Sequence, residues 1–436
     1  MPPLVLESSL ADGTALFTSA AHLSAPLTTV HLIFALERAV PAIPGELEVL
    51  LEWMQRGTER RPRLELARAF GALGVEPQLS SFDSSIIFSF SAFDAIRLPI
   101  AALAAEQLYE PAFHDDELAR VIQEFDEDER ASHDDPAAIA ARAQRLARWN
   151  GTALSLPPNG SIRSRAKLTP EHLRNLHAAI FTRPAMIAIA AETNEPWRDC
   201  LSRHLVEGRP ARRFPFQPAT RSSLPARPQQ VVVDAPTMDH ASVMRFAPGP
   251  NAHDLRAIAS AKLYHEALCE GMSAPLMNEL RGQHALSYSV SSSLIDRGDL
   301  WDQLFEVEPA PNRVNEAIAR AQALWQNKEL LEQEDFERAR AQLRTSERIH
   351  AIDAARALSI TLREAILRGR PITWRDQLQE MRETLQMEEV INASRGWGLA
   401  AAPLATVIIG PAKALPKSLR ADAISVEQAF DPERFD

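Results

Sequence analysis

The stretch Thr28–Leu36, TTVHLIFAL, has the alternating apolar pattern of a β-strand with one covered face. Two segments with helical spacing of their apolar residues follow, at Gly45–Arg56 (GELEVLLEWMQR) and Arg63–Leu73. The period of two then returns at Ser84–Ala92 (SSIIFSFSA), which predicts a second strand. After further helices, this half of the sequence closes with a helix at Thr169–Phe181 and an apolar strand at Met186–Ala191.

The second half of the sequence repeats this order of elements. The corresponding segments are a strand at Ala241–Phe246, a helix at Ala252–Cys269, a strand at Ser287–Leu294, and a helix at Met387–Gly396 that leads into the strand Thr406–Gly410. Internal self-similarity of this kind indicates a duplicated unit. We therefore predict the α+β class, with two homologous domains that each consist of an antiparallel sheet covered by helices.

A segment without hydrophobic periodicity separates the two halves. Gly208–Gln230 contains five prolines and five arginines, a composition typical of an extended linker. The predicted organisation is an N-terminal domain at 1–210, a linker at 211–230 and a C-terminal domain at 231–436.

Composition excludes several classes of function. The 436 residues carry a formal charge of −11 without a basic run, so nucleic acid is not an expected partner. Two cysteines, Cys200 and Cys269, are too few for a disulfide framework or a structural zinc cage. No apolar stretch approaches the roughly 20 residues that span a bilayer, so we expect no membrane association. The start lacks the pattern of a secretory signal, which favours the cytoplasm, with the periplasm as the alternative if a signal has been removed.

The most informative motif is Gly271–Arg281 (GMSAPLMNELR), which continues as Gly282–Val290 (GQHALSYSV). It resembles the second-domain signature of the pitrilysin/insulinase superfamily of inverted zincin peptidases, in the branch related to the mitochondrial processing peptidase. The resemblance implies the processing-peptidase/LuxS-like fold. It also implies that Arg281 and Tyr288 hold the substrate carbonyl and stabilise an oxyanion at a zinc site. The alternative is structural, with Arg281 capping helix carbonyls and Tyr288 packing on its strand.

The same family carries zinc on a first-domain helix that reads H-x-x-E-H, and this sequence departs from that pattern. Counting back from Gly57 in Gly45–Arg56 and the following GTERR, the histidine positions fall on Glu48 and Glu52 and the base position on Leu51. A leucine cannot accept a proton, and without zinc the pKa of water stays near 15.7.

The position of the family's third ligand, a glutamate, falls on Glu124, with Glu127 as an alternative alignment. The acidic segment that contains them, Ile122–Glu127, is equally consistent with a solvated helix face. Glu48, Glu52 and Glu124 together remain a candidate set for a hard cation, although such an ion prefers six or more oxygens. The other histidines are scattered, and G-x-S-x-G is absent, so no other catalytic centre is predicted.

The resemblance thus implies a non-catalytic subunit of a heterodimeric zinc metallopeptidase. This chain would bind no metal or other cofactor itself. A homologous partner with an intact H-x-x-E-H would supply zinc and base, and the substrates would be peptides or unfolded polypeptides. In the family a sheet edge, matched here by Ser80–Phe90, receives the substrate as an added strand. Two alternatives remain: a structural or peptide-binding core-type subunit without a role in catalysis, and an independent hydrolase that uses Glu48 and Glu52 with another metal.

Overall fold

The structure is a computed structural model of the 436-residue chain. It describes residues 5–19, 27–36, 42–82, 85–150, 155–182, 184–210, 229–298, 300–327, 331–350 and 353–431. The predicted linker 211–230 lies outside these described residues except for its last two positions.

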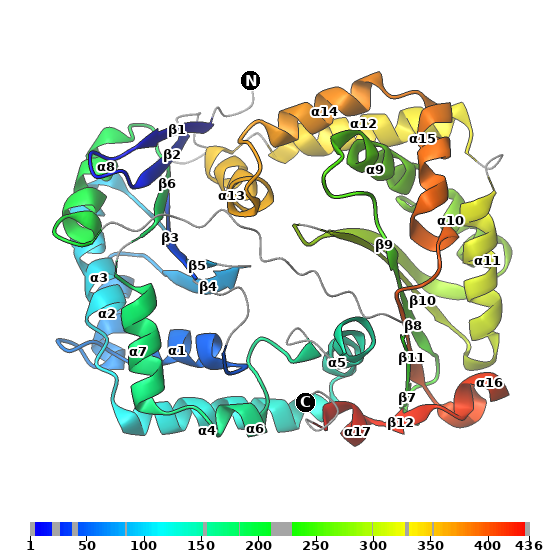
Figure 1. The fold of residues 1–436 in the computed structure, drawn as a ribbon, viewed down its shortest axis with the longest axis horizontal. Helices are drawn as coiled ribbons and strands as arrows, with labels where there is room; N and C mark the ends of the chain where they lie inside the picture. Colours follow the sequence, from blue (N-terminus) through cyan, green and yellow to red (C-terminus); the bar gives the residue numbers. More distant parts are fainter. Residues whose placement is uncertain are drawn as a thin grey trace. The chain divides into compact units, whose positions relative to one another are not determined.

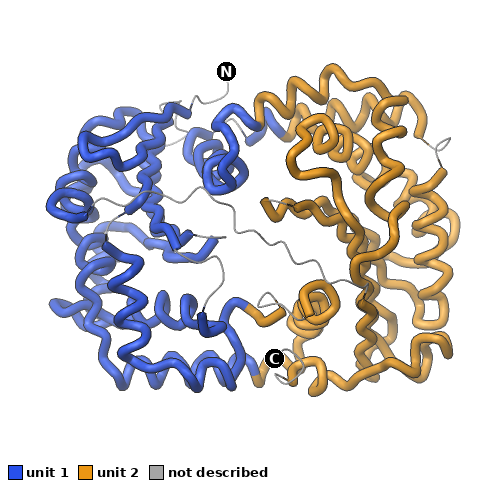
Figure 2. The backbone as a smooth tube through the Cα atoms, in the orientation of Figure 1, with its two compact units in different colours: residues 1–129, 158–219, 347–374 blue, residues 130–157, 220–346, 375–436 orange. Residues whose placement is uncertain are grey.

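The chain divides into two compact units (Figure 2). Unit 1 comprises residues 1–129, 158–219 and 347–374, and unit 2 comprises residues 130–157, 220–346 and 375–436. The units differ from the predicted domains because the segments 130–157 and 347–374 each lie with the unit that is built mainly from the other half of the sequence.

Unit 1 is built on a six-stranded mixed sheet (Figure 1). Its strand order is β1(Val5–Ser9), β2(Ala15–Ser19), β6(Met186–Ala190), β3(Thr28–Ala35), β5(Ser85–Ala92) and β4(Gln78–Phe82). The pairs β6–β3, β3–β5 and β5–β4 are antiparallel, whereas β2 and β6 run parallel.

Unit 2 has its own six-stranded sheet, five strands of which repeat the topology of unit 1. Its strand order is β12(Ala423–Ser425), β7(Gln229–Asp234), β11(Ala405–Gly410), β8(Ser242–Pro248), β10(Trp301–Pro309) and β9(Ser287–Asp296). The pair β7–β11 is parallel and the next three pairs are antiparallel, as in unit 1. Five strands therefore match in order and direction, which confirms the duplicated α+β architecture, although the sheets are mixed rather than purely antiparallel.

Helices cover the sheets of both units. In unit 1 they are α1(Glu46–Met54), α2(Arg63–Ala72), α3(Arg97–Tyr109), α4(Asp115–Ala131), α6(Ile162–Arg165), α7(Pro170–Ile180), α8(Glu195–Leu201) and α13(Ala354–Glu364). In unit 2 they are α5(Pro136–Trp149), α9(Leu255–Cys269), α10(Pro275–Met277), α11(Val314–Gln326), α12(Gln333–His350), α14(Trp374–Thr384), α15(Met387–Ala393), α16(Lys417–Arg420) and α17(Val426–Phe430). The ends of α4 and α12 extend across the boundary between the two units.

Two helices are exchanged between the halves of the sequence. Helix α5 packs on β7 and β11, where Ile139 and Leu146 share a core with Val407. Helix α13 packs on β2 and β6, and its Leu358 shares a core with Ile33 of β3. Each fully buried leucine or isoleucine of this kind stabilises the fold by about 1.5–3 kcal/mol. Burial of apolar surface therefore explains why each helix lies on the other half's sheet.

A histidine of β3 lies against the exchanged helix α13. The Nε2 atom of His31 lies 2.9 Å from the hydroxyl of Ser359. Burial, assisted by the positive charge of Arg363, lowers the pKa of His31 from 6.5 to about 4. The imidazole is consequently neutral at pH 7 in the folded protein.

This depressed pKa predicts that unit 1 loses stability in acid. Below pH 6.5 His31 binds a proton in the unfolded state, whereas in the folded state it binds one only near pH 4. The free energy of unfolding is therefore undiminished by His31 above pH 6.5. It falls by up to about 3 kcal/mol between pH 6.5 and 4. Denaturant unfolding across this range should show a flatter pH dependence for His31→Gln than for the wild type. The exposed His253→Gln variant serves as control, and identical profiles for all three proteins would contradict the prediction.

Candidate functional site

Arg281 and Tyr288 lie at the two ends of a tight reversal in unit 2. Arg281 belongs to a π-helical turn, Asn278–Gln283, and Tyr288 is the second residue of β9. The chain reverses through Ala285, whose φ of 44° lies in the left-handed region. The amide of Leu286 donates to the carbonyl of Leu280 at 2.8 Å and closes the turn.

This reversal brings the two predicted side chains into contact. The Arg281 guanidinium carbon lies 4.1 Å from the centroid of the Tyr288 ring, a cation–π geometry. Tyr288 is 81% exposed, and no hydrogen bond to its hydroxyl occurs within the described residues. In the same described part of the chain Arg281 has no carboxylate partner, and its Nη1 lies 3.9 Å from the sulfur of Met272. Both donors are therefore available to a ligand.

A polar network holds the turn between them. Arg320 of α11 donates to Glu279 at 3.0 Å and contacts Nε2 of His284 at 2.8 Å. Arg313 donates to the carbonyl of His284 at 3.3 Å. Because Glu279 and His284 flank Arg281 in sequence, these bonds fix the backbone from which Arg281 projects. The structure therefore places both residues of the motif side by side on one supported turn.

The helix at the zinc-helix position in unit 1 is α1. It begins after Gly45, whose φ of +93° and close approach to the carbonyl of Asn159 leave no room for a side chain. Leu51 is 5% exposed and belongs to the hydrophobic core of unit 1. The residue at the predicted base position is thus a packing residue.

Two of the predicted ligand positions converge on a residue that the sequence interpretation missed, Arg56. Its Nη2 donates to Glu52 at 2.6 Å and to Glu124 of α4 at 2.5 Å, and its Nη1 donates to Glu124 at 3.1 Å. The Arg56 side chain is only 4% exposed, compared with 35% for Glu52 and 53% for Glu124. The sequence signal was the spacing of Glu52 and Arg56, which is that of an i,i+4 ion pair on one helix face.

The charges of this cluster stabilise each other. The hydrogen bond from Arg56 and the positive charges of Arg56 and Arg63 lower the pKa of Glu124, although burial opposes the shift. Burial disfavours the charged form of Arg56, but the hydrogen bonds and charges of Glu124 and Glu52 outweigh it and raise the pKa of the guanidinium. Arg56 and Glu124 are therefore each stabilised in their charged forms.

These residues do not fit a zinc or hard-cation site. Glu48 accepts a hydrogen bond from Ser81 of β4 at 2.9 Å, so it is engaged away from the pair on Arg56. A guanidinium already occupies the point at which Glu52 and Glu124 meet. Throughout the described part of the chain, no group of three or more His, Cys, Asp or Glu side chains is arranged to hold a metal ion. The candidate cation set therefore has no supporting geometry, and we derive no metal chemistry from it.

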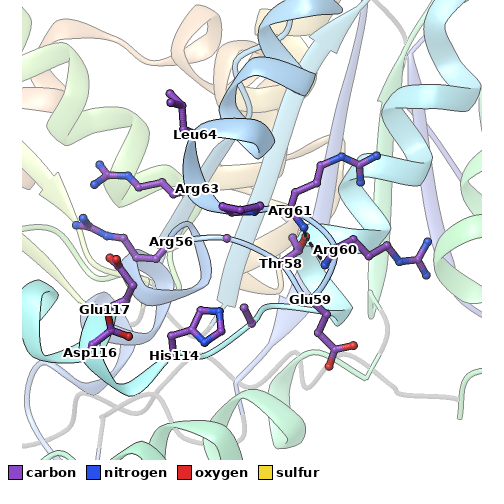
Figure 3. A pocket seen from close by; sticks show the side chains of 13 residues that line it. Arg56, Thr58, Glu59, Arg60, Arg61, Arg63, Leu64, His114, Asp116 and Glu117 are labelled. Carbon is purple, nitrogen blue, oxygen red and sulfur yellow. Dashed lines mark hydrogen bonds between the residues drawn. The ribbon is translucent and has the colours of Figure 1, made fainter.

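A pocket of about 370 Å³ lies beside this cluster, lined by residues 56–64, 112, 114, 116 and 117 (Figure 3). Thr58 fixes the turn in the lining segment 56–64, because its Oγ1 accepts a hydrogen bond from the amide of Arg61 at 3.0 Å. The figure shows Arg56 and Arg63 pointing to one side and Arg60 and Arg61 to the other. Arg60 pairs with Glu110 and Arg61 with Glu106, so much of the positive charge is neutralised.

Comparisons with known proteins agree with this architecture. Residues 167–343 match the family model of the peptidase M16 inactive domain. The crystal structure of a peptidase M16 inactive domain from Pseudomonas fluorescens is similar, with a TM-score of 0.77 and 19% identity over 94% of this chain and 99% of the other. A protease from Helicobacter pylori is similar over 94% of this chain and 100% of its own, with a TM-score of 0.79 and 14% identity. A comparison with curated proteins found no match.

A third solved structure is longer than this chain. The periplasmic protease PqqL from Escherichia coli has a TM-score of 0.72 and 14% identity, and the match covers 93% of this chain but 45% of PqqL. The duplicated α+β units thus define a chain of the M16 peptidase fold. The match of residues 167–343 to the peptidase M16 inactive domain agrees with the resemblance seen in the sequence.

The described helices also bear on membrane association. None of them is long and apolar enough to cross a bilayer.

Proposed function

We propose that this chain is the non-catalytic subunit of a two-chain zinc peptidase and contributes Arg281 and Tyr288 to the active site of its partner. The observation that carries the proposal is an asymmetry between the two sites. The base position is filled by the core residue Leu51, and the ligand positions Glu52 and Glu124 are tied to Arg56. The donor pair in unit 2, in contrast, consists of an exposed Tyr288 and a half-buried Arg281 that contact each other, and no carboxylate engages either of them within the described residues.

The chemistry of the donor pair suits an oxyanion. A guanidinium and a phenol both present N–H or O–H groups, and the charge of the guanidinium is fixed before the reaction begins. Preorganised donors of this kind are most valuable where negative charge develops in the transition state. The network around His284 supplies the preorganisation, because it holds the turn that carries Arg281.

Among the described residues at the zinc-helix position of α1, no group is placed to deprotonate water to hydroxide near neutral pH. The proposal therefore assigns zinc and the general base to a homologous partner with an intact H-x-x-E-H. The substrates that fit this assignment are peptides or unfolded polypeptide segments, since the two donors recognise a backbone carbonyl rather than a particular side chain.

The partner can be identified directly. The tagged full-length chain, purified from the organism that encodes it, should retain a homologous chain with an intact H-x-x-E-H and about one zinc per pair of chains. Mass spectrometry and elemental analysis measure both. Purification without such a chain, together with measurable affinity for peptides, would instead favour the alternative of a structural or peptide-binding subunit.

The compartment is part of the proposal. The compartment expected for this chain is the cytoplasm, whereas the similar structure PqqL is a periplasmic protease. We propose the cytoplasm, and cell fractionation with an antibody against this chain should recover it there. Recovery in the periplasmic fraction would reverse that assignment without affecting the role of the donor pair.

A further inference from the structure

We infer that the guanidinium of Arg56 replaces a metal ion in unit 1: it is the cation on which carboxylates of α1 and α4 converge, and its presence excludes a divalent metal from this position. This inference concerns unit 1 alone and does not depend on the proposed role of Arg281 and Tyr288.

The convergence is specific to one atom. Arg56 lies in the turn after α1, and its Nη2 donates to Glu52 of α1 at 2.6 Å and to Glu124 of α4 at 2.5 Å. These are charge-assisted hydrogen bonds, and the one to Glu124 joins residues that are 68 positions apart in sequence. A metal ion bound by the same carboxylates would join α1 to α4 in the same way. The guanidinium can therefore take the structural role that such a metal ion would have.

Charge accounts for the exclusion of a metal. One positive guanidinium faces two carboxylates, and the charge of Arg63 also acts on Glu124, so the cluster is already close to neutral. A divalent cation at the convergence point would lie in contact with the guanidinium, where like charges repel most strongly. Burial holds Arg56 in place, since its side chain is 4% exposed and its Nε is enclosed.

The first test restores the two histidines and asks whether Arg56 still prevents metal binding. Two full-length proteins are compared, both with Glu48→His and Glu52→His, and one of them also with Arg56→Met. Leu51 is left unchanged, because it lies in the core and does not bind metal. Competition with a chromophoric chelator measures zinc affinity, and circular dichroism verifies that both proteins are folded.

We expect the protein with Arg56→Met to bind zinc at least 100-fold more tightly than the protein that retains Arg56. Equal affinities would overturn the inference, whether both were tight or both weak, because Arg56 would then not be the group that decides metal binding.

The second test uses the native ligand positions and needs no metal. If Arg56 joins α1 to α4, Arg56→Met should increase amide hydrogen exchange in α4 around Leu118–Phe125 by at least tenfold. Arg120→Met is the matched control, because Arg120 also lies on α4 but is 62% exposed and pairs with carboxylates of its own helix. Unchanged exchange in the Arg56 variant, or an equal increase in both variants, would show that Arg56 does not act as the replacing cation.

Discussion

In the proposed two-chain enzyme, Arg281→Ala in this chain should lower kcat by about 10²–10³ while KM changes little. The physical reason is that one preorganised donor to a developing oxyanion is worth about 2.7–4 kcal/mol in the transition state. Arg281 has no competing carboxylate within the described residues, so its removal should not disturb another ion pair. The measurement is steady-state hydrolysis of a quenched fluorogenic peptide by the mixed complex, with assembly verified by size-exclusion chromatography.

Two further variants make this result specific. Arg395→Ala removes an exposed arginine elsewhere in unit 2 and should leave kcat unchanged. Tyr288→Phe keeps the ring on which Arg281 packs but removes the hydroxyl, so it should lower kcat without loosening the arginine. Wild-type kcat in the Arg281→Ala complex would exclude the proposed role and leave the structural or peptide-binding alternative.

Asp302→Ala should destabilise unit 2 by about 3–5 kcal/mol, because it leaves a buried arginine without its partner. Arg148 of the exchanged helix α5 donates to Asp302 through Nε at 3.1 Å and Nη2 at 2.8 Å, and the two side chains are 1% and 0% exposed. Arg297 adds a third bond to the same carboxylate at 2.9 Å. Thermal unfolding should show a fall in Tm of about 10 °C for a unit of this size.

The control variants distinguish the effect of leaving a buried charge unpaired from the effect of removing an aspartate or the whole pair. Asp422→Ala removes an exposed aspartate and should change stability by less than about 0.5 kcal/mol. The double variant Arg148→Met with Asp302→Leu removes both buried charges and should recover most of the lost stability, since a buried pair gains little over apolar residues. A single Asp302→Ala variant as stable as the wild type would mean that this pair does not hold α5 on the sheet.

Local periodicity was sufficient to predict β3, β5, β6, β8, β9 and β11 and the duplication, but it matched β9 to β5, whereas β9 has the place of β4 in the sheet. The strand predicted at Ser84–Ala92 is β5, Ser85–Ala92, and the one predicted at Met186–Ala191 is β6, Met186–Ala190. The strand Trp301–Pro309 and the short strands at the sheet edges were not predicted from the sequence. Strand β1 shows why, because its burial pattern has one buried residue followed by four exposed ones and so carries little hydrophobic signal.

The exchange of α5 and α13 was beyond the reach of sequence patterns. The apolar stripe of α5, which includes Ile139 and Leu146, indicates a covered face but does not say which sheet covers it. The buried pair of Arg148 and Asp302 joins residues 154 positions apart, and no spacing rule connects them. Such long-range partners become visible only in the folded chain.

The candidate sites likewise contain some features that the sequence could predict and one that it could not. Arg281 and Tyr288 could be singled out because both lie in one short motif, and the structure brings them into contact. The loss of the zinc ligands was also readable from Glu48, Leu51 and Glu52. Arg56 was missed because its role depends on Glu124, which only the packing of α4 against α1 brings to it.

The most direct measurement of the central claim is a peptidase assay on this chain prepared without any partner and supplied with zinc. The account predicts no cleavage of fluorogenic peptides by the isolated chain, and chelator-sensitive cleavage once the homologous subunit with an intact H-x-x-E-H is added. Chelator-sensitive cleavage by the isolated chain, lost in its Tyr288→Phe variant and therefore not due to a contaminant, would contradict the account.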